Sequence, residues 1–438
     1  MGRGRGRSRA KKGLLIGGVV VAGLALWAQA VGRTPQVVLP VPTPLPRPNA
    51  YDFSVKAGEI EVRGDEKTGA TTSPERGEPV APLDARLALL KANTPALRTL
   101  RQGFAHPYRQ PPVRSFDDPF GPDLAKMRAL ALLLTFEGGL RAEQGDAGGA
   151  ANSYLDAVRF GVDLPNGGPL ITGLVGVACE AIGRQRLWEI APKLSAKEAR
   201  AVTRRLEQIE PRRTDYADTL LTEKHGGQAT MLEQFRKKGT VALARELATL
   251  DPELNLDMDE AAPVWETIKV GARLMTRSRS RIFRDYSAYM DALVARARQP
   301  YAVEPPAPPA PDDPMSEYLA GIYDQGRFVV EGARVQEALL TTHLVLLAYR
   351  AERGTYPASL DALVRDGYLA RVPDDPFAPS GPLRYRRVSD TRCVLYSVGP
   401  DGRDDGGTAI DDPAAGGSKR HRVEVDSRGD IVARVNTG

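Results

Sequence analysis

The chain has 438 residues, of which 42% are hydrophobic and 26% charged, a composition that is typical of globular proteins and excludes full disorder. This length exceeds one compact core, so we expect two or three domains. The formal net charge is +5, but six basic residues lie within 1–12, so the rest is close to neutral. A near-neutral remainder argues against nucleic acid as a partner, because such binding needs basic side chains gathered on a folded face.

The first expected elements are a basic cytoplasmic tail at 1–12 and a transmembrane helix at 13–32. The second segment contains no charged residue, and about 20 helical residues are enough to cross a bilayer core. Its basic N-terminal flank predicts that everything after it is exported, and Trp27 suits a retained anchor. The alternative is a cleaved signal peptide, because Ala28 and Ala30 form an A-x-A cleavage site. Both interpretations predict a protein at the bacterial cytoplasmic membrane whose bulk faces the periplasm or the exterior.

Two proline-rich segments divide the remaining chain. In the segment 33–81, alternating prolines forbid a helix and predict an extended stalk that holds the following domain away from the membrane. The segment 300–314 is the second, and we place a domain boundary there. The alternating prolines of the first segment are Pro40, Pro42, Pro44, Pro46 and Pro48.

Between these segments, residues 82–299 predict a mainly α-helical domain, because apolar residues recur at three- and four-residue spacing. Two helices are expected to meet at Gly145, and Ser195 with Glu198 predicts a capping box that opens another helix. About 40 residues around the Gly145 turn resemble a tetratricopeptide-type helical hairpin, without a second copy at the expected period. The basic cluster 277–284 is interpreted as a solvated helix face, with an anionic partner as the alternative.

Residues 315–438 predict a smaller α+β domain with one long helix and a small antiparallel sheet. The long helix is expected to end at Gly354, and Ser359 is expected to cap a short helix after it. Strand-like stretches follow, and the last two are expected to form a hairpin around Gly429. The four stretches are LRYRRV, RCVLYSV, HRVEV and DIVARV.

The part of this domain at about 330–415 resembles the globular head of type II secretion major pseudopilins. Two departures accompany the resemblance: the apolar segment lies about 300 residues upstream, and Phe377 and Ala378 replace a usual tryptophan-glycine pair. The helix that would pack the core of a pilus is therefore missing, and we expect no polymerisation. The matching positions are Tyr349, Gly354, Tyr356, Pro357, Leu360, Leu363, Pro373, Asp375, Pro376, Tyr385, Tyr396, Ser397, Gly399, Asp401, Gly402, Gly406, Gly407, Asp411 and Asp412.

The resemblance implies a structural Ca²⁺ ion in the aspartate- and glycine-rich stretch 395–413. Calcium takes six to eight hard oxygens, and glycines let the chain bring such oxygens together. Asp404 and Asp405 could substitute as ligands or remain solvated, and a solvated turn without an ion is the alternative for the whole stretch. An EF-hand is excluded by the order of the residues. The expected ligands are the side chains of Asp401, Asp411 and Asp412 and carbonyl groups around Ser397 and Val398.

The sequence contains no recognisable catalytic motif. His343 falls in an apolar stretch and is expected to be a packed side chain, and Glu223 and His225 are spaced for different faces of a helix. Cys179 and Cys393 are expected to be separate thiols, although an exported protein permits a disulfide. We therefore expect an interaction or scaffolding protein of the envelope that has protein partners there and is linked to type II secretion or pilus-type machinery. The alternative is an envelope hydrolase with its site in the helical domain.

Overall fold

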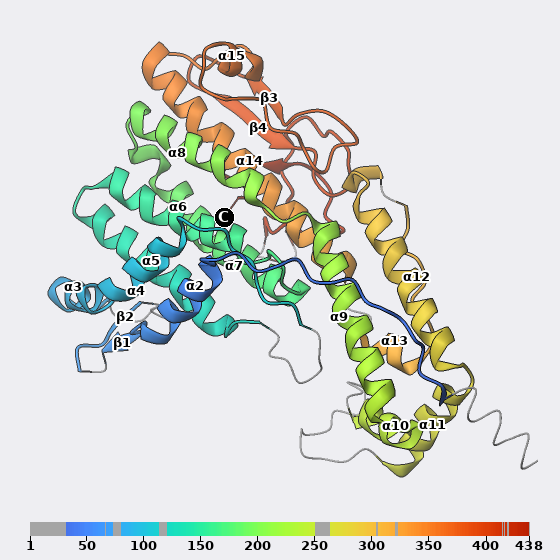
Figure 1. Ribbon diagram of the computed structural model, residues 1–438. Helices are drawn as coiled ribbons and strands as arrows, with labels where there is room; N and C mark the ends of the chain where they lie inside the picture. Colours follow the sequence, from blue (N-terminus) through green and yellow to red (C-terminus); the bar gives the residue numbers. More distant parts are fainter. Residues whose placement is uncertain are drawn as a thin grey trace, which may run out of the picture.

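The computed structural model describes residues 32–437 apart from 66, 73–79, 114–120, 250–262, 304, 320–322, 414, 416 and 418–419 (Figure 1). The predicted basic tail and all of the predicted transmembrane helix except Gly32 therefore lie outside the described residues. Among the helices that are described, none has both the length and the apolar character needed to cross a bilayer.

The described chain is mainly helical, with a small antiparallel sheet near its C-terminus. This agrees with the predicted helical domain and with the predicted long helix and sheet of the α+β domain. The main helices are α2 (Ala50–Ile60), α3 (Leu83–Ala92), α4 (Thr94–Gly103), α5 (Leu124–Glu143), α6 (Ala147–Asp163), α7 (Leu170–Ile190), α8 (Ala196–Ile209), α9 (Tyr216–Lys237), α10 (Thr240–Thr249), α11 (Val264–Met275), α12 (Arg279–Ala297), α13 (Pro314–Leu319), α14 (Tyr323–Arg353) and α15 (Leu360–Arg365). The strands are β1 (Gly64–Asp65), β2 (Ala70–Thr71), β3 (Arg384–Arg387), β4 (Cys393–Ser397) and β5 (Ile431–Val432).

Local signals in the sequence place several helix ends. The predicted reversal between α5 and α6 is confirmed: Gly145 has a φ of 80°, and Asp146 caps α6 by accepting from the Gly149 N–H. The predicted capping box is confirmed as well, since Ser195 and Glu198 exchange side-chain and backbone hydrogen bonds at the start of α8. These caps supply partners for backbone N–H groups that a helix start leaves open.

Helices α6 and α7 are in backbone contact. A Cβ atom on Gly161 would lie 2.4 Å from the Glu180 nitrogen and 2.5 Å from the Gly176 oxygen. A Cβ atom on Gly183 would lie 2.6 Å from the Tyr154 oxygen. Only glycine fits these positions, and the close approach brings the buried side chains of both helices into one core with α8.

Helices α9 and α12 lie side by side and form an arm that ends in α10 and α11 (Figure 1). The arm has its own core, in which Phe235 of α9, Leu247 of α10, Leu274 of α11 and Tyr286 of α12 are buried together. The arm thus presents α10 and α11 at one end of the molecule.

The predicted stalk at 33–81 differs from an extended spacer in the structure. The first described residues of this segment lie against α9: Thr34 donates to the Phe235 carbonyl at 3.0 Å, and Leu39 packs on the core of the arm. Asn49 then caps α2 and donates to the Arg109 carbonyl at 2.7 Å. The proline pattern correctly excludes a helix over residues 33–49, but contacts with α9 hold this segment, named here the N-terminal strap, on the protein.

The C-terminal sheet has the order β3-β4-β5, and both pairings are antiparallel. The two longer predicted strands are confirmed, whereas the hairpin predicted around Gly429 is wrong. Residues 421–425 form no strand, and β5 pairs instead with β4, with Val432 opposite Tyr396. Burial explains the difference, since Ile431 joins the core of this domain while Arg422 stays exposed. The predicted end of α14 is confirmed by Gly354, which has a φ of 80°.

Helix α14 belongs to two cores at once. Leu339 and Leu346 are buried with β4, β5 and α15, whereas Leu340 and Leu344 are buried with α6, α7 and α8. In Figure 1, α14 accordingly lies between the helical layer and the small sheet. The contacts of α14 therefore join the segments on either side of the proline-rich residues 300–314.

Candidate functional site

The residues predicted to hold calcium lie in the connection between β4 and β5. Ser397 and Val398 are buried, and both donate to one carboxylate: the Ser397 hydroxyl lies 2.7 Å and the Val398 N–H 2.9 Å from the oxygens of Asp375. The Phe377 N–H donates to the same group at 3.1 Å. Asp375 is part of the pair that the pseudopilin resemblance marked, but the sequence did not identify it as the acceptor that holds this strand end.

The three predicted aspartate ligands each make a different kind of interaction within the protein. Asp401 accepts from the Arg403 N–H at 3.1 Å, a local turn contact. Asp411 binds Arg420 through both carboxylate oxygens, one of them 2.7 Å from a guanidinium nitrogen, and this hydrogen bond holds its pKa below the usual range. Asp412 donates its backbone N–H to the Arg420 carbonyl at 2.8 Å. Across the described ranges, no three acidic, histidine or cysteine side chains are placed to share a metal ion.

A second buried carboxylate, Asp430, organises the middle of this loop. It accepts from the N–H groups of Asp405 at 3.3 Å, Gly407 at 2.7 Å and Thr408 at 3.1 Å. Nearby, Asp404 accepts from the Tyr396 hydroxyl at 2.9 Å. Burial raises the pKa of Asp430, and the hydrogen bonds from the Gly407 and Asp405 N–H groups oppose this rise. The loop therefore directs N–H donors at protein carboxylates, and a calcium ion would require Asp411 to leave Arg420. Calcium binding stays a prediction.

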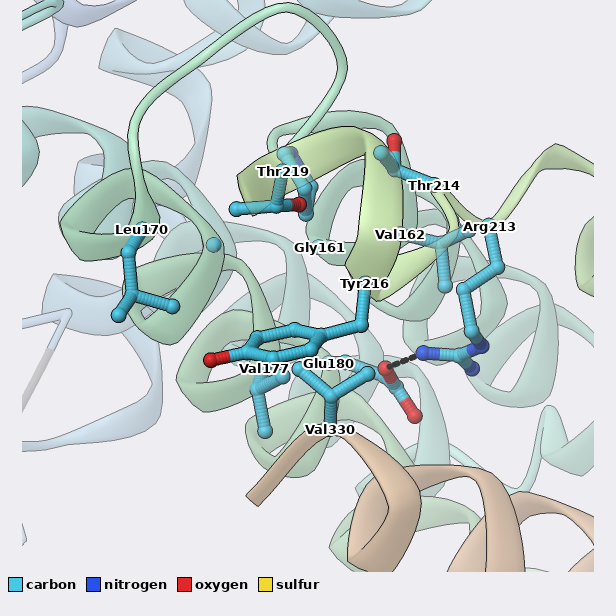
Figure 2. A pocket seen from close by; sticks show the side chains of 12 residues that line it. Gly161, Val162, Leu170, Val177, Glu180, Arg213, Thr214, Tyr216, Thr219 and Val330 are labelled. Carbon is cyan, nitrogen blue, oxygen red and sulfur yellow. Dashed lines mark hydrogen bonds and ion pairs between the residues drawn. The ribbon is translucent and has the colours of Figure 1, made fainter. Parts of the chain in front are cut away.

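A cluster of charged side chains lies elsewhere, where α7, α14 and the turn before α9 meet. Arg213 binds three carboxylates: Glu180 at 2.8 Å, Glu210 at 2.9 Å, and Glu337. Glu180 also binds Arg184 at 2.7 Å. Only 6% of the Arg213 side chain is exposed, and Glu180 and Glu337 are buried with it, whereas 41% of the Glu210 side chain is exposed. These residues are named here the Arg213 cluster. Figure 2 shows the ion pair between Arg213 and Glu180.

The Arg213 cluster holds three carboxylates and two guanidinium groups. Burial raises the pKa of Glu337 to about 8. The charge of Arg213 lowers this pKa, and the charges of Glu180 and Glu210 raise it. Burial also disfavours the charge on Arg213, but its neighbours outweigh this and hold its pKa well above the usual value. A proton on Glu337 makes the cluster neutral, which is the stable state for buried ionic groups.

A small cavity adjoins the Arg213 cluster (Figure 2). It is lined by Glu180, Arg213, Tyr216 and Val330 among other residues, and its volume is about 20 Å³. This volume accommodates about one water molecule. The cavity is therefore too small for an organic substrate.

A larger cleft that Glu337 also lines lies between the end of α8, α14 and the loop 370–376. Its volume is about 400 Å³, and its walls include Leu206, Glu337, Ala338 and Pro373. One carboxyl oxygen of Glu337, Oε1, has no hydrogen-bond partner. No pattern in the sequence predicts this cleft, because its walls come from segments far apart in the chain.

Three further groups that the sequence singled out are His343, the two cysteines and the basic cluster 277–284. His343 packs against Trp188 with ring centroids 4.9 Å apart, and burial lowers its pKa to about 4, so its predicted packed role is confirmed. Cys179 and Cys393 are separate thiols, which confirms that prediction too. In the basic cluster 277–284, Arg279 donates to the Lys238 carbonyl at 2.9 Å.

Comparison of the chain with family models, curated proteins and solved structures found no match. The resemblances to pseudopilin heads and to tetratricopeptide-type hairpins therefore stay predictions from the sequence.

Proposed function

We propose that this protein is a membrane-anchored scaffold of the bacterial envelope. In this proposal, residues 13–32 span the cytoplasmic membrane, and the bulk of the chain lies in the periplasm or outside the cell. The α+β domain is a pseudopilin-like head, stabilised by Ca²⁺, that binds protein components of a type II secretion or pilus-type machinery. The head does not polymerise and performs no catalysis.

The double burial of α14 is the observation that carries the proposal. A pilin-type helix packs against other copies in a fibre, and it needs a free apolar face to do so. Here Leu339 and Leu346 face the head core, while Leu340 and Leu344 face the helical core. Both apolar faces are used within one chain, which favours a head held in a fixed orientation over a fibre subunit.

An envelope hydrolase remains the second candidate, and the cleft beside Glu337 favours it. Burial raises the pKa of Glu337, and a carboxyl group with a raised pKa beside a partly apolar cleft has the properties of a general acid. Under this alternative Glu337→Gln abolishes turnover of a substrate bound in the cleft. Under the scaffold proposal the same variant binds its envelope partners as the wild type does.

Site-specific photocrosslinking in the producing bacterium tests the scaffold proposal. A benzophenone amino acid replaces Val388, which is 43% exposed in the head, and a matched control carries it at Ile171, which is 47% exposed at the start of α7. We expect the head position to yield adducts with envelope proteins of secretion or pilus assembly, identified by mass spectrometry. Identical adducts from both positions, or adducts with further copies of this chain alone, would contradict the proposal.

A further inference from the structure

The end of the arm exposes large apolar side chains. On α11, 76% of Val264, 61% of Trp265 and 66% of Ile268 are exposed, and 70% of Val241 is exposed on α10. Positions 264 and 268 are one helical turn apart, so the α11 side chains lie on one side of the helix. The buried Val270 shows that a different side of α11 packs into the arm. The four exposed side chains are named here the tip patch.

The N-terminal strap leads to the same end of the molecule. Thr34 donates to the carbonyl of Phe235, in the last turn of α9, and α10 begins at Thr240. Val37 and Leu39 line a groove with Leu232 of the same helix. The dark blue start of the described chain accordingly lies near the end that carries α10 and α11 (Figure 1).

This path fixes where an N-terminal anchor would leave the protein. Gly32 is two residues before Thr34, and two residues of extended chain reach about 7 Å. A membrane segment at 13–32 would therefore end within about 7 Å of the hydrogen bond between Thr34 and α9. The strap gives no long tether that could carry the arm away from the bilayer.

We propose that the tip patch inserts into the interface of the bilayer that anchors the chain. This inference rests on the membrane anchor of the proposed function, and it names the lipid surface as the occupant of the patch. Tryptophan favours the interfacial region, where its ring lies among headgroups. Val264 and Ile268 are solvent-exposed apolar neighbours of Trp265 that would be buried in the same region. The arm would then stand on the membrane at two points, the anchor and the tip patch.

Burial of apolar surface, and not charge, drives this contact. Residues 250–262, which connect α10 to α11, carry five carboxylates in the sequence. Attraction to anionic lipid therefore has no part in the inference. We expect the contact to form on vesicles of uncharged phosphatidylcholine and to persist at high salt, since screening weakens only electrostatic attraction.

The test uses the full chain reconstituted in phosphatidylcholine vesicles. Ile268→Cys is labelled with the polarity-sensitive dye NBD, Val388→Cys in the head is the matched control, and the labelled wild type gives the background from its own cysteines. Quenching is measured with doxyl groups on the upper acyl chains and, separately, with iodide in water. Flotation of the vesicles reports on the anchor alone. We expect the chain to float and lipid-borne doxyl to quench position 268 several-fold more than position 388.

Each other result overturns the inference in a recognisable way. A chain that floats but shows equal doxyl quenching at both positions keeps the anchor and removes the tip contact. Position 268 shielded from iodide without quenching by doxyl would mean that protein, either a second copy or residues 13–32, covers the patch. A chain that fails to float refutes the anchor, and with it both this inference and the membrane part of the proposed function.

Discussion

Arg213 donates a hydrogen bond to Glu337, which lies 124 positions later in the chain, and both side chains are almost completely buried. The pair connects the helical layer to α14, and α14 in turn supports the sheet of the head. The Arg213 guanidinium and the carboxylates around it therefore join α14 to the helical layer, in addition to the apolar contacts of Leu340 and Leu344.

Removal of the Arg213 guanidinium should strongly destabilise the protein. In Arg213→Met, the buried carboxyl groups of Glu180 and Glu337 lose their shared partner inside the fold, and breaking a buried pair costs about 3–5 kcal/mol. The measurement is the free energy of unfolding in urea. Arg186→Ala is the matched control, because Arg186 is 54% exposed and pairs with Glu189 on the surface, where such a pair contributes about 0–1 kcal/mol. An equal loss of unfolding free energy in the two variants would contradict the role of Arg213 as a buried partner of these carboxyl groups.

The proton on Glu337 predicts a dependence of stability on pH. The pKa of Glu337 is about 8 in the folded protein and near its ordinary 4.5 when unfolded, so between these values the folded state binds the extra proton. The stabilisation that protonated Glu337 contributes is complete below the pKa of this group in the unfolded chain. It is lost as pH rises through the pKa of Glu337 in the folded protein.

Glu337→Gln imitates the protonated side chain and should remove this dependence. Urea unfolding at about pH 5, 7 and 9 should show the wild type losing stability relative to Glu337→Gln as pH rises. Glu189→Gln, which alters a half-exposed carboxyl in α7, should leave the dependence of the wild type unchanged. Parallel curves for the wild type and Glu337→Gln would show that Glu337 is ionised throughout.

Two glycine substitutions should have effects of opposite sign. In Gly161→Ala the new methyl group meets the backbone of α7, and forcing such an overlap apart costs about 1–3 kcal/mol or more. In Gly139→Ala, within α5, the methyl group meets no atom within 4 Å, and alanine should stabilise the helix by about 0.5–1 kcal/mol. Thermal unfolding followed by circular dichroism measures both. A stable Gly161→Ala variant would refute the backbone contact between α6 and α7.

Calcium should raise the unfolding temperature if the loop between β4 and β5 binds it. Thermal unfolding of the full chain is compared in excess EDTA and in millimolar Ca²⁺. A free Ca²⁺ concentration of about 100 times the dissociation constant stabilises the folded state by about 2.7 kcal/mol. Asp412→Ala should abolish the increase, whereas Asp366→Ala, an exposed residue after α15, should preserve it. No increase in the wild type would leave the loop organised by Asp375 and Asp430 alone.

The sequence alone predicted the local features of the fold, which depend only on residues adjacent in the chain. The turn at Gly145, the capping box at Ser195 and the end of α14 at Gly354 were all confirmed, because each needs only the backbone preferences of a few adjacent residues. The helical character of the central domain and two of the strands followed from periodicity for the same reason.

Contacts between distant segments were decided only by the tertiary structure. Sequence spacing could not show that Arg213 meets Glu337, that Asp430 accepts three backbone N–H groups, or that β5 pairs with β4. It also predicted a free stalk where Thr34 and Leu39 hold the strap on the arm. Each of these depends on which buried surfaces and unsatisfied polar groups come together when the chain folds, and residues far apart in sequence carry no local sign of that choice.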